Sequence, residues 1–155
     1  MSYVRQQCRM VINRISEDRR FIQAIVGPRQ VGKTTLVNQV LENIKVPYTL
    51  HSADGILPTN AEWIGTVWED VRLQMDFLKQ PEHLLVIDEI QKIQNWSEMV
   101  KKEWDRDTRE RRNIKVVILG SSRLLIMKGL TESLAGRFEL IRMGHWSYGE
   151  MHDAF

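Results

Sequence analysis

Several features are scarce in this sequence of 155 residues, and each shortage excludes a class of protein. The single cysteine, Cys8, leaves no intramolecular disulfide to form, so a reducing compartment, the cytoplasm, is expected. No apolar run approaches the roughly 20 residues that cross a bilayer, and the first residues lack a signal-peptide core, so we expect no membrane contact. The sequence also lacks an excess of charge of either sign. With 22 basic and 20 acidic residues, the net charge of +2 leaves nucleic-acid binding possible but unsupported.

What is present is an ordinary globular mixture with 43% hydrophobic and 27% charged residues. There is no internal repeat and no Pro/Gly/Ser-rich linker, which predicts a single domain over 1–155. Apolar residues recur at helical spacing from Val4 to Ile15, so an amphipathic helix is expected within 1–18.

Further along the chain, apolar runs alternate with helical patterns. Strands are predicted at 21–26, 46–50, 84–87, 116–119 and 138–141. Helices are predicted at 33–43, 64–78, 96–111 and 124–134, the last one broken near Gly129. Apolar strands separated by helices predict an α/β fold, a three-layer sandwich with a parallel five-stranded sheet.

Residues 27–34 match the phosphate-binding pattern G-x-x-x-x-G-K-[ST] at every specified position. A glycine lets backbone N–H groups approach phosphates, and the helix that follows adds its positive end. Lys33 is expected to reach the β- and γ-phosphates, and the Thr34 hydroxyl to bind Mg²⁺. The predicted nucleotide-binding residues are Gly27, Pro28, Arg29, Gln30, Val31, Gly32, Lys33, Thr34 and Thr35.

An acidic pair, Asp88 and Glu89, follows the very apolar run at 84–87. The carboxyl end of a strand in an open parallel sheet is where ligands bind, and the phosphate loop is expected at the same edge. Asp88 is therefore assigned to the Mg²⁺ shell, and Glu89 to orienting and deprotonating an attacking water. The alternative is that the pair simply marks a solvated strand end.

Two further polar residues are candidates for catalysis. Ser121 comes just after the strand at 116–119 and Gly120, at the edge of the sheet expected to bind the nucleotide; alternatively Ser121 and Ser122 form a turn, with Ser122 as the helix N-cap. Arg137 precedes the last strand, and its planar, permanently charged guanidinium suits the charge that develops on phosphate. The alternative is that Arg137 caps the preceding helix beside Gly136.

Other polar and aromatic stretches predict no chemistry. The residues at 101–112 are dense in both signs of charge, which is typical of a solvated helix face. The tryptophans at 63, 68, 96 and 104 are interpreted as packing residues of helices.

Taken together, these motifs resemble the prokaryotic AAA-type ATPases that carry a C-terminal domain of unknown function. The blocks that carry the resemblance are GPRQVGKTTL, LLVIDEIQKIQNW, VVILGSSRLLI, ESLAGRFELI and GHWSYGEM. Two features are similar to the branch of P-loop proteins with an additional strand and a catalytic glutamate: the strand expected at 46–50, which lies in sequence between the loop strand and the acidic strand, and the glutamate beside Asp88. The resemblance implies ATP and Mg²⁺ as ligands, Ser121 as a contact of the γ-phosphate or the water, and Arg137 as an arginine finger in a homo-oligomer. It also implies a chain that holds the ATPase domain without lid or effector domain.

Three functions are compatible with these features. The first is Mg²⁺-dependent ATP hydrolysis that drives motion of another domain or partner, slow in the isolated domain because any arginine finger needs a neighbour. The second is a nucleotide-dependent switch or scaffold with negligible turnover. A small-molecule kinase ranks last, since the sequence shows no Arg-rich lid and no acceptor pocket.

Overall fold

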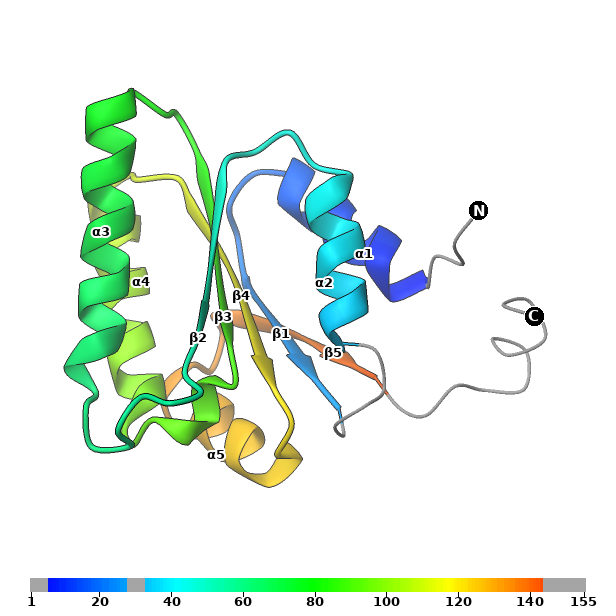
Figure 1. Ribbon diagram of the computed structural model, residues 1–155, viewed down its shortest axis with the longest axis vertical. Helices are drawn as coiled ribbons and strands as arrows, with labels where there is room; N and C mark the ends of the chain where they lie inside the picture. The colour runs from blue at the N-terminus through cyan, green and yellow to red at the C-terminus, as the bar shows by residue number, and fades with distance from the viewer. Residues whose placement is uncertain (1–5, 28–32, 144–155) are drawn as a thin grey trace.

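The computed structural model describes residues 6–27 and 33–143, which form a parallel sheet with helices on both faces (Figure 1). The five strands are β1 (Ile22–Val26), β2 (Tyr48–Ser52), β3 (His83–Asp88), β4 (Ile114–Gly120) and β5 (Phe138–Arg142). The helices are α1 (Gln6–Ser16), α2 (Lys33–Glu42), α3 (Glu62–Leu78), the 3₁₀ helix η1 (Ile90–Lys92), α4 (Trp96–Glu110) and α5 (Arg123–Ser133). None of these described helices has the length and apolar character needed to cross a bilayer.

The strand order in the sheet is β2-β3-β4-β1-β5, and every neighbouring pair is parallel. Helices α1 and α2 pack on one face, where Val11, Leu36 and Val40 contact a core that includes Ile25 and Val117. Helices α3, α4 and α5 cover the other face. The three-layer α/β fold predicted from the sequence is therefore confirmed.

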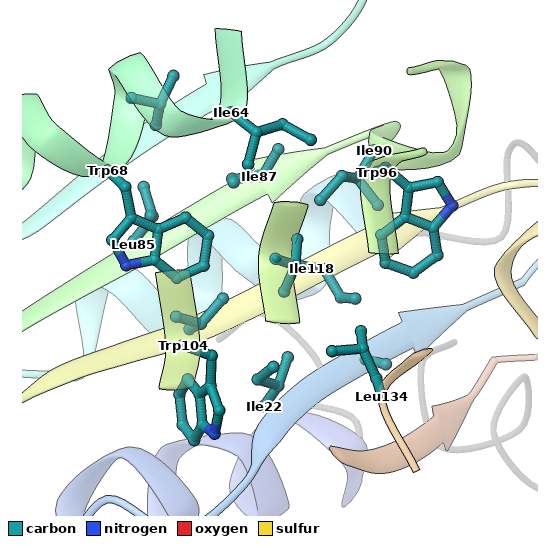
Figure 2. Packing of buried hydrophobic residues seen from close by; sticks show 14 of the residues in the cluster. Ile22, Ile64, Trp68, Leu85, Ile87, Ile90, Trp96, Trp104, Ile118 and Leu134 are labelled. Carbon is teal, nitrogen blue, oxygen red and sulfur yellow. The ribbon is translucent and has the colours of Figure 1, made fainter. Parts of the chain in front are cut away.

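The larger core, between the sheet and α3–α5, is built around tryptophans. Trp68, Trp96 and Trp104 are at most 5% exposed, and in Figure 2 they surround the strand residues Ile87 and Ile118. Their assignment as packing residues is confirmed. A buried indole removes a large apolar area from water, so these side chains fix the helices on the sheet.

Two details of the predicted elements are wrong. The strand expected at 46–50 is β2, which begins only at Tyr48, because Pro47 has no N–H for the sheet and contributes only its carbonyl, which accepts from the N–H of Leu84 at 2.8 Å. As expected, this strand comes between β1 and β3 in sequence; in the sheet it lies at the edge, and β4 separates β1 from β3. Helix α5 also runs unbroken through Gly129.

The charged stretch at 101–112 is only partly a solvated face. Glu103 and Asp107 of α4 are buried, and both contact the buried guanidinium of Arg72 on α3: Nη1 lies 2.7 Å from Glu103 Oε2, and Nε lies 3.0 Å from Asp107 Oδ1. Trp68 Nε1 donates to the other oxygen of Asp107 at 2.8 Å. Burial raises the pKa of Asp107, and the bonds from Trp68 and Arg72 offset part of that rise. Some of the charged residues of α4 therefore belong to a buried network of hydrogen bonds and ion pairs that joins α4 to α3.

Candidate functional site

The parallel topology brings the carboxyl ends of three strands side by side. Val26 of β1 is in register with Gly120 of β4, and Ile87 of β3 is in register with Ile118 of β4. The arrowheads of β1, β3 and β4 point to one edge in Figure 1, and both α2 and α5 begin there. The residues that follow these three strands, predicted to bind and hydrolyse a nucleotide, therefore belong to a single edge of the sheet.

The expected phosphate loop connects β1 to α2 at this edge. Gly27 follows β1, and a side chain could not be accommodated there, because a Cβ would lie 2.2 Å from the carbonyl oxygen of Met143. Lys33 and Thr34 are the first residues of α2, and Thr35 is exposed in its first turn. The remaining residues assigned to the loop lie outside the described part of the chain; they are Pro28, Arg29, Gln30, Val31 and Gly32.

The acidic pair occupies the end of β3 and the turn after it. Asp88 is the half-buried last residue of β3, and its carbonyl accepts from the N–H of Ala53 at 2.9 Å. Glu89 is 9% exposed and has φ 53° and ψ 37°, the left-handed region that residues other than glycine seldom adopt. Such backbone conformations occur preferentially at functional sites. The sharp turn at Glu89 starts η1.

Ser121 and Glu89 are in direct contact. Ser121 Oγ donates to Glu89 Oε2 at 2.9 Å. Contact of Ser121 with the γ-phosphate or the water stays a prediction. The alternative for this turn, with Ser122 as the helix N-cap, is confirmed, since Ser122 Oγ accepts from the N–H of Leu125 at 3.4 Å and caps α5. The two serines thus have separate structural roles.

One residue of this cluster was missed by the sequence reasoning. Gln91 Nε2 donates to the same oxygen of Glu89, Oε2, at 2.7 Å, and it lies 3.5 Å from Ser121 Oγ. Gln91 stands in η1, two residues after Glu89. Nothing in its sequence context distinguishes it from the neighbouring Gln94, because the contact depends on the left-handed turn at Glu89.

Arg137 does not join this edge of the sheet. It precedes β5, at the end of the sheet where the parallel strands begin, and its guanidinium is paired with Asp105 of α4: Nε lies 2.8 Å from Oδ1 and Nη2 lies 3.0 Å from Oδ2. Nη1 also donates to the carbonyl of Ala135, just after α5, at 3.3 Å. Contact with a neighbouring subunit's nucleotide stays a prediction.

The donor set at the edge suits a nucleotide with Mg²⁺. Asp88 at the end of β3 and Thr34 at the start of α2 are residue types that carry the hard oxygen ligands that Mg²⁺ prefers. The N-terminus of α2 adds the positive end of its dipole, which favours phosphate. Because Gly27 has no side chain, the backbone at the start of the loop can lie close to the backbone of Met143, which follows β5.

These features define the class of protein: a P-loop nucleotide-binding fold with the strand order β2-β3-β4-β1-β5 and a glutamate after the acidic strand. A family model described as an AAA domain matches residues 19–152. The chain therefore belongs to this AAA family of nucleotide-binding ATPases.

The comparison with solved structures agrees on the fold. A variant of RuvB from Thermotoga maritima superposes with a TM-score of 0.63 at 13% sequence identity, over 97% of this chain and 47% of that one. Similarity at this level shows the fold alone, and the chain spans about half the length of that protein. A search of curated proteins found no match.

Proposed function

We propose that this chain binds ATP with Mg²⁺ and hydrolyses it, and that hydrolysis drives a conformational change in another domain or partner. The observation that carries the proposal is the cluster at the carboxyl edge of the sheet, where Glu89 is held by Ser121 beside the metal-ligand candidate Asp88. This edge also bears the start of α2, which follows the phosphate-loop pattern.

Each of these residues has a distinct task in the proposed reaction. Lys33 binds the β- and γ-phosphates. Thr34 and Asp88 would hold Mg²⁺, which would neutralise the charge that develops on the phosphate oxygens. Glu89 accepts a proton from the attacking water, and Ser121 holds its carboxylate.

Two substitutions test the proposal. Lys33→Ala is expected to weaken ATP binding about 10- to 100-fold or more, since a charged contact to phosphate is lost. Glu89→Gln is expected to bind ATP as wild type does and to lower turnover about 10²- to 10⁴-fold, the usual contribution of a general base. Binding is measured by calorimetry and turnover by phosphate release.

Matched controls are available on the surface. Lys45→Ala and Glu42→Gln change exposed side chains of the same kinds and should leave binding and turnover unchanged. If Glu89→Gln released phosphate as fast as wild type, the assignment of the base would be wrong.

The second candidate function, a switch with negligible turnover, is favoured by one observation. The Arg137 guanidinium is held by Asp105 of its own chain, so no arginine reaches the site from this position within one subunit. Tight retention of ATP with no phosphate release at any protein concentration would select the switch.

A further inference from the structure

We propose that Gln91 is a positioning residue for the catalytic glutamate: its side-chain amide holds the Glu89 carboxylate in the orientation that accepts a proton from water. The inference rests on the proposed function, in which Glu89 is the base. Gln91 does not itself touch the reacting atoms in this scheme. It acts through Glu89.

The contact geometry singles out one carboxylate oxygen. Gln91 Nε2 and Ser121 Oγ both donate to Oε2 of Glu89, at 2.7 and 2.9 Å. With Oε2 fixed by two donors from different elements, rotation of the carboxylate about its last bond is restricted. The second oxygen, Oε1, is then the one presented to water.

The orientation of the Gln91 amide follows from chemistry. An ionised carboxylate only accepts hydrogen bonds, so the NH₂ group and not the oxygen of the amide must face it. Among the described residues the amide oxygen Oε1 of Gln91 is buried with no hydrogen-bond partner. A buried acceptor without a partner lowers stability, which indicates that this side chain is placed for its contact with Glu89 and not for the stability of the fold.

The fold holds Gln91 in place from both sides. Ile90 and Ile93 are at most 1% exposed and fix η1 to the core, while Gln91 itself is 9% exposed. At the end of β4, a Cβ on Gly120 would lie 2.4 Å from Ile126 Cγ1 and 2.7 Å from Gln91 Oε1. The glycine at this position therefore makes room for both side chains.

Loss of the amide should affect catalysis and not binding. Gln91→Met keeps the length and volume of the side chain and removes the donor, so the Glu89 carboxylate keeps one of its two restraints. We expect kcat to fall about 10- to 100-fold, the range set by a hydrogen bond to a charged group, with KM and ATP affinity within about twofold of wild type. Gln91→Glu, which has the same shape and adds a negative charge, should lose at least as much.

The decisive measurement is a double-mutant cycle with Glu89→Gln, followed by single-turnover ATP hydrolysis with the chain in excess over Mg·ATP. If Gln91 acts through Glu89, adding Gln91→Met to Glu89→Gln costs no further activity. A side chain needed only for packing would lower the residual rate again, or would reduce ATP binding. Gln94→Met, an exposed glutamine three residues further on, is the matched control and should behave as wild type.

Each outcome separates the inference from the function on which it rests. Wild-type turnover by Gln91→Met overturns the inference alone, provided that Glu89→Gln is slow. Faster turnover by Gln91→Met also overturns it, because the amide would then restrain Glu89 in an unproductive orientation. Wild-type turnover by Glu89→Gln, or none by the unaltered chain, would instead overturn the proposed function.

Discussion

His83, the first residue of β3, is a fully buried histidine whose neutral form fits its surroundings. Its Nδ1 lies 2.9 Å from Gln80 Oε1, an acceptor, and its Nε2 lies 3.2 Å from the hydroxyl of Thr49. A ring with its proton on Nδ1 satisfies both contacts. Burial lowers the pKa of His83 below its ordinary value of about 6.5.

Because the pKa of His83 is lowered by burial, we predict that the free energy of unfolding decreases in acid. Below about pH 6.5 the unfolded chain binds a proton at His83 that the folded chain does not, so the stability present above that pH is lost as the pH falls. The loss is at most about 1.4 kcal/mol per pH unit down to the folded-state pKa. Urea unfolding of His83→Gln between pH 5 and 7.5 should show a smaller dependence on pH than wild type. Equal slopes for the two proteins would contradict the prediction.

At the scale of single residues, the sequence predicts what is local. The phosphate-loop pattern and the acidic pair are readable because each depends on a few consecutive residues. The contact of Ser121 with Glu89 could be expected from strands that end at one edge, but the contact of Gln91 could not. It depends on a left-handed turn at a glutamate, and residue type gives no sign of that conformation.

Two helical glycines make opposite predictions for the same substitution. In α3, a Cβ on Gly65 would lie 3.7 Å from the nearest atom, Met99 Cε, so Gly65→Ala should stabilise the protein by up to about 1 kcal/mol through helix propensity. In α5, a Cβ on Gly129 would lie 2.4 Å from the indole of Trp96, so Gly129→Ala should destabilise it by about 1–3 kcal/mol through overpacking.

Thermal unfolding of both variants beside wild type checks the pair, with the midpoint rising for Gly65→Ala and falling for Gly129→Ala. Each variant is the control for the other, because the chemical change is identical. A stabilising Gly129→Ala would show that Trp96 can move away from α5 without cost.

The same glycine explains why prediction at the scale of elements was incomplete. From helix propensity alone, Gly129 predicts a break in the helix. The glycine is instead needed for packing, because the indole of Trp96 occupies the space that a side chain at position 129 would fill. Likewise, the sequence predicts that Asp107 is exposed to solvent. A charged residue of a helix can be buried when another element supplies its ion partner, and the sequence does not show that Arg72 of α3 does so here. The number and kind of the major elements can be predicted from the periodicity of apolar residues. The order of the strands in the sheet cannot, because nothing in the sequences of β2 and β4 shows which strands they pair with.

At the scale of the whole molecule, we predict that the proposed activity depends on assembly through Arg137. Its pair with Asp105 leaves both side chains about one third exposed, at 32% and 31%, so the guanidinium is accessible at the surface. Exposed ion pairs are worth only about 0–1 kcal/mol, so a nucleotide bound to a second copy could displace Asp105 at little cost. Turnover per chain should then rise with protein concentration.

Mixing two inactive variants tests that dependence directly. The Lys33→Ala chain lacks a working site but has Arg137, and the Arg137→Ala chain has the site but lacks the arginine. If Arg137 acts on a neighbour's nucleotide, where such an arginine contributes on the order of 10³ or more in rate, each variant alone is nearly inactive and the mixture recovers phosphate release. Arg109→Ala, which removes an exposed arginine of α4, should be as active as wild type without mixing with a second variant. Because each chain in the mixture supplies what the other lacks, failure to recover turnover, with the variants folded and binding one another, would show that Arg137 does not act on a neighbour's nucleotide.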